Sequence, residues 1–319
     1  MNLAIMCSGG DAPGMNAAVK KFVDYTEERG ETPYLIFDGL EGLIDGRIKR
    51  ASHADVAGIL HRGGSVIRSS RSQRFYEYDY RKQAYENLRK EGIEGLVVLG
   101  GDGSFRAMER FCGEFDVRFV GIPTTIDNDI YGTDYCLGVD TALNTIRDAL
   151  DKIYDTASTF NRAFVVEVMG RECGYLAAIS AISSGAEICV IPEVDFNRAV
   201  AEERLKEEIA AGRRYILAIV AEGTGRTEEI ARWIENSLGF ETRVTVLGHI
   251  QRGGAPTTFD RMMGFEFAVT AVDRLLSGEK ANRVTVWKNG AIELLDIESV
   301  VSHKNRLNPH HLAMLNRLD

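Results

Sequence analysis

The stretch Leu96-Val97-Val98-Leu99-Gly100-Gly101-Asp102-Gly103-Ser104 decides the fold. Its four apolar residues predict a buried parallel strand, and residues 105–111 have the pattern of a helix. A strand that ends in glycines and opens a helix leaves backbone N–H groups for an anion, and the helix dipole favours negative charge there. Asp102 adds an oxygen ligand that suits Mg²⁺. The stretch therefore predicts either a Mg²⁺–polyphosphate cradle or an Asp-capped strand-to-helix turn.

The composition is that of a globular protein and limits its partners. The chain has 319 residues, 45% hydrophobic and 27% charged, which suits two domains or one large α/β unit. Its net charge of −9 argues against nucleic acid or an anionic membrane as the main partner. We expect no signal peptide and no membrane span. The cysteines are scattered and lack CxxC spacing, so we expect reduced thiols in the cytoplasm and no zinc site.

Strand-like runs alternate with amphipathic helices along most of the chain, which favours a parallel α/β architecture with open sheets in two lobes. The first run, residues 3–7, leads into a second glycine-rich loop at residues 8–16 that matches neither GxGxxG nor GxxxxGK[ST]. Two such loops in one sheet favour a shared phosphate site over two unrelated turns. Residues 39–43 are expected to form a turn, and a polar tail is expected after residues 284–287.

Acidic residues follow a further predicted strand at residues 118–122. Asp127 and Asp129 lie one residue apart, past a strand end where α/β sheets place their chemistry. In an extended loop their carboxylates would point the same way, so that one could meet a metal while the other takes a proton from a hydroxyl. An Asx-turn is the alternative. Beside two phosphate-type loops, we favour the functional interpretation.

Basic and polar residues lie at or near predicted strand ends in the middle of the chain. A planar guanidinium matches a phosphate bidentately and stays charged, and a carboxylate suits sugar hydroxyls. Each residue alone is more typical of an ion pair or a structural histidine. Together they predict an anion site for a phosphorylated substrate. The residues are Arg162, Arg171, Glu222, Arg243, His249 and Arg252.

These blocks, in this order and over essentially the full length, resemble the bacterial-type 6-phosphofructokinases. The matching blocks are residues 9–16, 100–104, 123–129, 169–171 and 248–254. The resemblance implies a two-lobed three-layer αβα sandwich, the phosphofructokinase fold, with mostly parallel sheets. It implies a nucleotide-binding lobe of residues 1–138 plus 251–301 and a sugar-phosphate lobe of residues 139–250 plus 302–319. The implied reaction is transfer of the γ-phosphoryl of Mg-ATP to O1 of fructose 6-phosphate, a step of glycolysis.

The resemblance also assigns roles residue by residue. Asp127 is implied as the base for the sugar 1-hydroxyl, and Arg171 as the group that stabilises the charge of the transferring phosphoryl. Asp102 and Asp129 are implied to hold Mg²⁺. Contacts to the nucleotide or its transferring phosphoryl are implied for Gly10, Arg71, Gly101, Gly103, Ser104 and Thr125. Contacts to the sugar phosphate are implied for Met169, Gly170, Glu222, His249 and Arg252, with Arg162 and Arg243 from a neighbouring subunit of a homotetramer.

Departures from the family pattern bear on the donor and on regulation. Pyrophosphate-dependent members usually carry Asp at the position of Gly103 and Lys at that of Thr124, whereas ATP-type members have Gly at the latter. Glu41 and Ser72 depart from residues common near the nucleotide, so we expect ATP with altered base contacts. An effector site for ADP or phosphoenolpyruvate would use Lys20 or Lys21, Glu187 and Arg213, and we expect weak or altered control.

Three alternatives compete with an ATP-dependent kinase. A pyrophosphate-dependent enzyme is motivated by Thr124. A non-catalytic nucleotide-binding subunit is disfavoured because Asp102, Asp127, Asp129 and Arg171 are all present. An NAD kinase is disfavoured by residues 248–254 and by the set of arginines.

Overall fold

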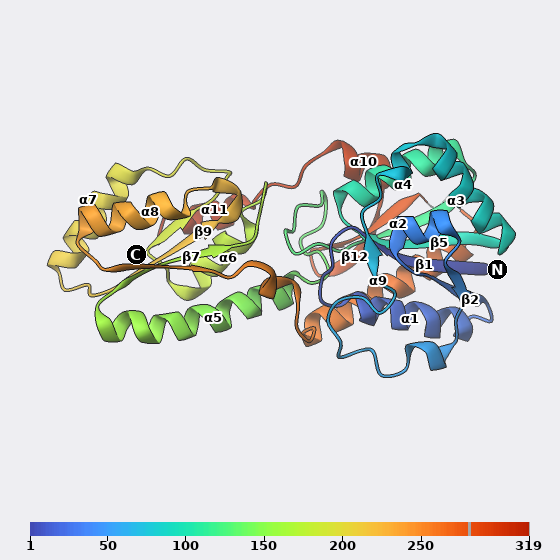
Figure 1. The fold of residues 1–319 in the computed structure, drawn as a ribbon, viewed down its shortest axis with the longest axis horizontal. Coiled ribbons are helices and arrows are strands. Elements are labelled where there is room, and N and C mark those ends of the chain that lie inside the picture. Colours follow the sequence, from blue (N-terminus) through green and yellow to red (C-terminus); the bar gives the residue numbers. More distant parts are fainter. Residues whose placement is uncertain (280–281, 319) are drawn as a thin grey trace. The chain divides into compact units, whose positions relative to one another are not determined.

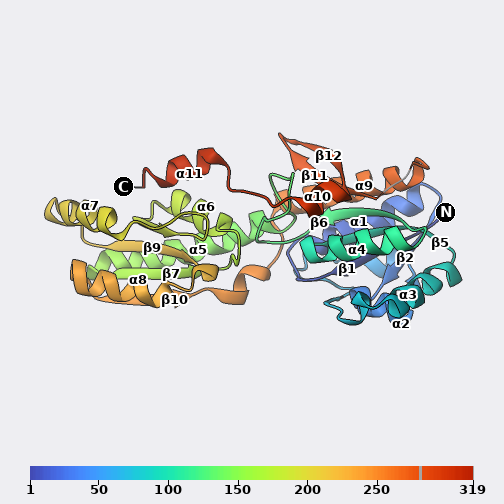
Figure 2. The same ribbon diagram turned by 90° about the horizontal axis from the view of Figure 1, so that it is seen from above.

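The computed structural model describes residues 1–279 and 282–318. The chain forms two compact units, residues 1–141 with 252–305 and residues 142–251 with 306–319. It passes from one unit to the other after Thr141, after Gln251 and after Asn305. Each unit is a sheet of mostly parallel strands with its own helices (Figures 1 and 2).

The first unit holds an eight-stranded sheet with the order β12-β11-β6-β5-β1-β2-β3, and β4 pairs with the end of β1. All neighbours are parallel except β2 with β3 and β11 with β12. The sheet therefore has a parallel centre and antiparallel edges. Its strands are β1 (Asn2–Ser8), β2 (Thr32–Ile36), β3 (Ile48–Arg50), β4 (Ser69–Ser70), β5 (Ile93–Gly100), β6 (Arg118–Pro123), β11 (Arg283–Lys288) and β12 (Ala291–Asp296).

Helices cover both faces of this sheet, because its central strands are apolar on both sides. Leu3 and Ile5 of β1 pack in one cluster with Phe22 of α1 (Met15–Glu28) and Phe267 of α9 (Thr258–Leu276). On the other face, Phe105 of α4 meets Phe119 of β6 with ring centroids 6.3 Å apart. That face also carries α2 (Gly39–Asp45), α3 (Tyr78–Lys90) and α10 (Ile297–Ser302), as Figure 1 shows, and α4 spans Asp102–Glu114.

The second unit holds a four-stranded, fully parallel sheet with the order β10-β7-β9-β8. Its strands are β7 (Ala163–Val168), β8 (Ile188–Val190), β9 (Ile216–Ala221) and β10 (Thr242–Val246). Alternate residues such as Val165 and Ala218 pack in one cluster with Leu205 and Ile230. These come from α7 (Arg198–Ala210) and α8 (Thr227–Trp233), whereas α6 (Tyr175–Ser184) packs on β8 and β9 outside that cluster. The remaining helices are α5 (Val139–Phe160) and α11 (Pro309–Leu315).

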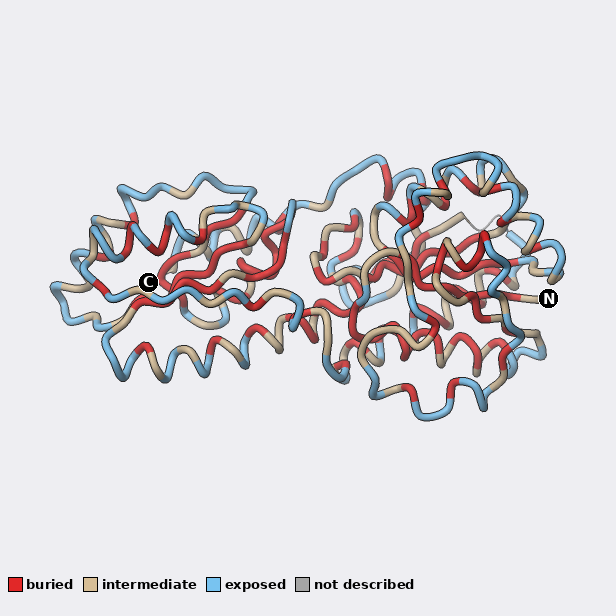
Figure 3. Tube along the Cα trace, in the orientation of Figure 1, coloured by how far each residue is buried: buried red, intermediate tan, exposed pale blue. Residues whose placement is uncertain are grey.

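Burial is greatest along the central strands of both sheets, and exposure follows the edge strands, outer helices and loops (Figure 3). The predicted α/β class is confirmed. The described residues contain no helix long and apolar enough to span a membrane.

One local prediction was wrong and another was incomplete. Residues 39–43 are helical and make up most of α2, whereas the sequence predicted a turn. A Cβ on Gly42 would lie 1.5 Å from the carbonyl oxygen of Phe37, so this glycine permits a close approach and does not mark a chain reversal. The expected polar tail contains α10 and α11. α11 begins with Asn308, which accepts a bond from the His310 amide (2.9 Å), and with Pro309 at its first position.

A buried carboxylate fixes the segment where the chain first leaves the first unit. Asp260 of α9 is fully buried and accepts bonds from the amides of Gly138 and Thr141, both at 2.8 Å. Burial raises the pKa of Asp260 to about 6, against the opposing effect of these donors. The start of α5 is thereby tied to the start of α9.

Candidate active site

The two glycine-rich loops lie side by side at the carboxyl edge of the first sheet. β1 has β2 on one side and β5 on the other, so the order of connection reverses between β1 and β5. Ligands of open α/β sheets bind at such switch points. Ser8, the last residue of β1, accepts a bond from the Ser104 hydroxyl at 2.9 Å, and this contact is buried. The structure therefore brings the loop after β1 and the start of α4 together, as predicted.

Arg71 belongs to the same edge. β4 pairs its Ser70 with Ser8 of β1, and the Gly9 amide donates to the Ser70 carbonyl at 3.2 Å. The Ser69 hydroxyl donates to the Gly9 carbonyl at 2.9 Å. Arg71 is the next residue after β4 and is exposed. Arg71 thus comes directly after a short strand that is fixed to the first glycine loop.

The start of α4 favours an anion over a capping interaction. Gly101 is the N-cap residue and has no side chain to satisfy the first amides of the helix. Asp102, the first helical residue, receives a bond from Arg106 Nε at 2.8 Å. A Cβ added to Gly103 would meet no atom within 4 Å. The Asp-capped turn is therefore wrong for this stretch, and open space lies beside Gly103.

The loop after β6 joins the same edge. The Thr124 amide donates to the Gly100 carbonyl at 2.9 Å, and the Asp127 amide donates to the Thr125 hydroxyl at 3.2 Å. Asp127 and Asp129 are half-buried. Asn128 between them has a left-handed backbone with φ 54°. The loop is therefore not extended at this residue, so strand alternation does not set the directions of the two carboxylates.

An arginine from the returning chain meets the first glycine loop. A Cβ on Gly10 would lie 2.8 Å from Nη1 of Arg252, and that nitrogen donates to the Asp11 carbonyl at 3.3 Å. Arg252 is the first residue of the chain's return to the first unit. The geometry brings its positive charge to a backbone cradle that the sequence predicts for phosphate.

A second group of predicted site residues lies at the carboxyl edge of the sheet in the second unit. Met169, Gly170 and Arg171 follow β7, and Glu222 follows β9. The Gly223 amide donates to the Gly170 carbonyl at 3.0 Å, and a Cβ on Gly223 would lie 1.8 Å from the Arg171 carbonyl oxygen. The backbones of the two loops thus touch.

A buried glutamine connects the third loop of this edge. Gln251 accepts a bond from the Met169 amide at 3.1 Å and donates to the Gly248 carbonyl at 2.9 Å. His249, exposed, follows β10 in the same segment. Gln251 lies within the block 248–254, but an uncharged residue between His249 and Arg252 carries no functional signal of its own in the sequence.

In the single chain, Arg162 and Arg243 do not lie with the predicted site residues that follow β7, β9 and β10. Arg162 precedes β7 and Arg243 is the second residue of β10, so both lie toward the amino ends of their strands. Both pair with Glu241, Arg162 through Nε at 2.8 Å. Both therefore lie at the amino edge of this sheet, whereas Arg171, Glu222 and His249 follow the carboxyl ends of their strands.

The residues predicted for an effector site are engaged with neighbours. Lys20 pairs with Asp24 at 2.6 Å, and Lys21 lies 5.0 Å from the centroid of the Tyr25 ring. In the second unit Glu187 is buried, bonded to Arg213 and, at 2.6 Å, to the Leu217 amide. Burial raises the pKa of Glu187 above its usual range.

Arg213 is held between two carboxylates. Besides Glu187, it pairs with Glu208 at 2.6 Å. A guanidinium neutralised in this way attracts a further anion less than a free one does.

The residues that depart from the family pattern near the donor also form hydrogen bonds or ion pairs within the protein. Thr124 is buried, and its hydroxyl donates to the Ile122 carbonyl at 3.0 Å. Glu41 pairs with Arg74, which holds the pKa of the Glu41 carboxyl below its usual range. Ser72 is buried and accepts a bond from the Phe75 amide at 3.1 Å.

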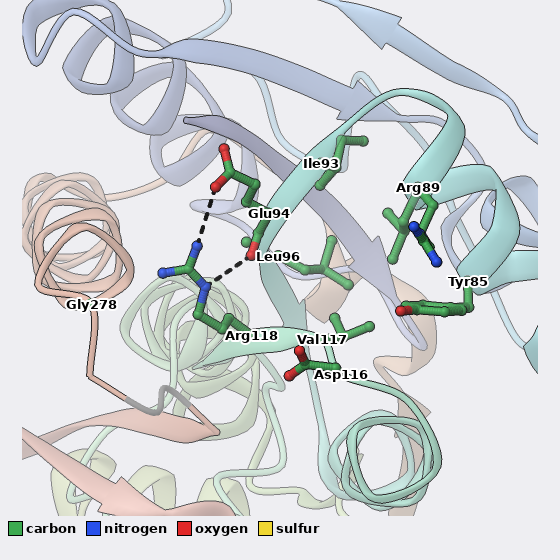
Figure 4. A pocket seen from close by; sticks show the side chains of 11 residues that line it. Tyr85, Arg89, Ile93, Glu94, Leu96, Asp116, Val117, Arg118 and Gly278 are labelled. Carbon is green, nitrogen blue, oxygen red and sulfur yellow. Dashed lines mark hydrogen bonds and ion pairs between the residues drawn. The ribbon is translucent and has the colours of Figure 1, made fainter.

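A cavity of about 470 Å³ lies away from these residues, at the amino ends of β5 and β6 (Figure 4). Arg118 in its wall donates to the Glu94 carbonyl at 3.1 Å and the Leu275 carbonyl at 3.3 Å, and it faces the Glu94 carboxylate at 3.6 Å. The positive charge of Arg118 is therefore engaged with groups of the protein itself. The second glycine loop and the Asp127 loop follow the opposite, carboxyl ends of β5 and β6.

Comparison with known proteins decides the family. Residues 2–275 match the family model described as Phosphofructokinase. The chain belongs to the phosphofructokinase family. The "ATP-dependent 6-phosphofructokinase" of Sulfurovum sp. strain NBC37-1 is 55% identical over 98% of this chain and 96% of that protein. The protein of the same name from Sulfurimonas denitrificans is 53% identical over 99% of each chain.

The fold is likewise that of the phosphofructokinase family. The phosphofructokinase structure from Saccharomyces cerevisiae matches with a TM-score of 0.90 and 35% identity, over 94% of this chain and 45% of that one. The family resemblance predicted from the sequence blocks is therefore confirmed.

Proposed function

We propose that this protein transfers the γ-phosphoryl of ATP to O1 of fructose 6-phosphate, giving fructose 1,6-bisphosphate and ADP. The observation that carries the proposal is the convergence of two glycine loops and the Asp127 loop at the switch point of the first sheet. Phosphoryl transfer needs mainly positioning and neutralisation of charge, which backbone amides and arginines supply. The similarity to relatives named for this reaction extends over the full chain and supports the same conclusion.

The first unit's residues take the following roles in the proposed reaction. Asp127 accepts the proton of the sugar 1-hydroxyl, so that the oxygen attacks the phosphorus as the proton leaves. The amides around Gly10 and at the start of α4, together with Gly101 and Ser104, hold the phosphates. Arg71 and Thr125 contact the transferring phosphoryl. Arg252 beside Gly10 offsets negative charge at the same cradle.

Asp102 and Asp129 fit a Mg²⁺ ion by their chemistry. Carboxylate oxygens are the ligands that this ion prefers, and Mg²⁺ bound with nucleotides commonly uses one or two carboxylates plus phosphate oxygens and water. Across residues 1–279 and 282–318 there is no group of three or more His, Cys, Asp and Glu residues that forms an all-protein metal site. Bound Mg²⁺ would neutralise charge on the phosphates. Asp102 would then exchange its bond with Arg106 for the ion.

The second unit's residues take the sugar phosphate. Arg171 supplies a fixed positive charge for the transferring group, and Glu222 suits the sugar hydroxyls. Met169, Gly170 and His249 complete this set. The backbone contact of Gly223 with Gly170 and Arg171 supports the proposal, because it fixes the loops that carry these side chains.

The donor is ATP in this proposal, and not pyrophosphate. The relatives at 53% and 55% identity are named as ATP-dependent. Thr124, which motivated the pyrophosphate alternative, has its hydroxyl bonded to Ile122 inside the sheet. A threonine carries no positive charge to attract pyrophosphate, whereas a lysine at this position would.

Measured initial rates with a panel of donors test the function. With fructose 6-phosphate and Mg²⁺, we expect turnover with ATP and none above background with pyrophosphate. Product is quantified as fructose 1,6-bisphosphate. Turnover with pyrophosphate alone would reverse the donor assignment, and no product with any donor would contradict the kinase and leave a non-catalytic nucleotide-binding subunit.

We propose that the protein acts in the cytoplasm as a homotetramer with sites shared between subunits. β10 is an edge strand of the second sheet; Val244 and Val246 on it and Ile250 just after it are exposed. Edge strands with apolar side chains are ready to meet another chain. Arg243 lies on the same strand, which supports its reaching a site of a neighbouring subunit.

Regulation by ADP or phosphoenolpyruvate is expected to be weak. Arg213 is neutralised by Glu187 and Glu208, so little positive charge is left for an anionic effector. We expect phosphoenolpyruvate to change the half-saturating fructose 6-phosphate concentration by less than about fivefold, the lower end of ordinary allosteric coupling. Initial rates against fructose 6-phosphate, with and without phosphoenolpyruvate, measure this. A large sigmoidal shift would contradict the expectation.

A further inference from the structure

Asn128, which lies between Asp127 and Asp129, is buried and held by hydrogen bonds to both its side chain and its backbone. It is 1% exposed and has φ 54°, a region that asparagine tolerates better than most residues. Its Nδ2 donates to the Asp134 carbonyl at 2.9 Å. Its Oδ1 accepts a bond from the Cys136 amide at 2.8 Å. Both the nitrogen and the oxygen of this side-chain amide therefore bond to the later part of the same loop, residues 134–136.

The backbone of Asn128 is held from a distant part of the chain. Nδ2 of Asn305 donates to the Asn128 carbonyl oxygen at 3.0 Å. Asn305 is the last residue of the first unit before the chain enters the second. The peptide group between Asn128 and Asp129 is thus fixed from outside the loop, and the amide side chain fixes it from inside.

We propose that Asn128 is a positioning residue for Asp127, with Asn305 as its outer anchor. This inference rests on the proposed kinase function. The left-handed turn at Asn128 sets the direction of the backbone on either side of it, and hence where the base and the neighbouring carboxylate lie. Catalysis by a base requires hydrogen-bond reach to the proton it takes, and a displacement of about 1 Å costs about 10²-fold in rate.

Substitutions at Asn128 separate its contributions. Asn128→Gly keeps the left-handed backbone accessible and removes both side-chain bonds. Asn128→Asp keeps an acceptor for the Cys136 amide but places an oxygen against the Asp134 carbonyl. Asn305→Ala removes one bond from outside the loop and leaves the loop sequence intact, so it is the mildest change. Asn289, also left-handed (φ 52°) and in the exposed turn between β11 and β12, gives the matched control Asn289→Gly.

The measurement is kcat with ATP and fructose 6-phosphate, alone and in an Asp127→Ser background. We expect Asn128→Gly to lower kcat by about 10²-fold with little change in either KM. Asn305→Ala should lower kcat less, and Asn289→Gly should leave it unchanged. Because Asn128 acts through Asp127, the same substitution should lower the residual rate of Asp127→Ser by less than about threefold.

Each outcome decides between a positioning and a merely structural role. Equal losses in both backgrounds, or a fall in melting temperature with kcat of the folded fraction unchanged, would overturn the proposal. Asn305→Ala gives the same comparison if Asn128→Gly does not fold, and a loss confined to the native background supports the proposal. An inactive unmodified protein would instead refute the kinase function, and this inference with it.

Discussion

Replacing Asp127 with Ser is expected to lower kcat by about 10²–10⁴-fold, the usual contribution of a general base. The half-buried carboxylate follows β6 at the edge where both glycine loops begin, and a serine there cannot take the proton of the sugar hydroxyl at neutral pH. Affinity for fructose 6-phosphate should change much less, because the charges assigned to its phosphate lie elsewhere. Steady-state kinetics at saturating ATP separate kcat from KM.

Asp116→Ser is the matched control for this substitution. Asp116 is exposed and lies just before the amino end of β6, in the wall of the cavity of Figure 4. It should leave kcat unchanged. Near-normal turnover of Asp127→Ser would show that another group takes the proton.

Replacing Gly103 with Asp is expected to lower kcat/KM for ATP by about 10²-fold or more, which corresponds to about 3 kcal/mol of lost interaction. The substitution brings a negative charge to the first turn of α4, where the phosphates of the donor are proposed to bind. Because a Cβ at this position meets no atom within 4 Å, the variant should fold normally. An added carboxylate there repels an anion and competes for the same amides.

Two variants separate charge from size at Gly103. Gly103→Asn has nearly the shape of the aspartate without its charge, and Gly103→Ala adds only a methyl group. We expect a small loss for Ala and an intermediate one for Asn. Gly113→Ala, at a second glycine of α4 with open space around it, controls for helix stability. Equal effects of Asp and Asn would show that crowding and not repulsion discriminates the donor.

The sequence was most informative where a pattern repeats along the chain. The apolar runs 3–7 and 96–99 predicted the central strands β1 and β5, because strands buried on both faces read as continuous apolar segments. The short, glycine-containing α2 was missed. Its Gly39 and Gly42 suggest a turn, whereas packing of Leu40 and Leu43 against the unit outweighs their low helix propensity.

The candidate site likewise combines residues that the sequence predicts with contacts that it does not. Residues that follow a strand directly, such as Gly10 and Asp127, were predictable, because a parallel sheet brings its carboxyl ends to one edge. Arg252 beside Gly10 depends on where the chain returns, after a long excursion through the second unit. Asn305 on the Asn128 carbonyl is likewise a contact across 177 positions. No local pattern announces such contacts.

By itself the sequence determined the α/β class, the two glycine-rich strand-to-helix loops and the family, because these depend on short-range periodicity and on blocks of contiguous residues. Only the tertiary structure decided that Gly101 and not Asp102 caps α4, that Thr124 turns its hydroxyl into the sheet, and that Asn128 is clamped between two parts of the chain. The physical reason is that a polar side chain has several partners within local reach. Which one it takes depends on the groups that distant segments bring beside it and on burial, which penalises any that are left unpaired.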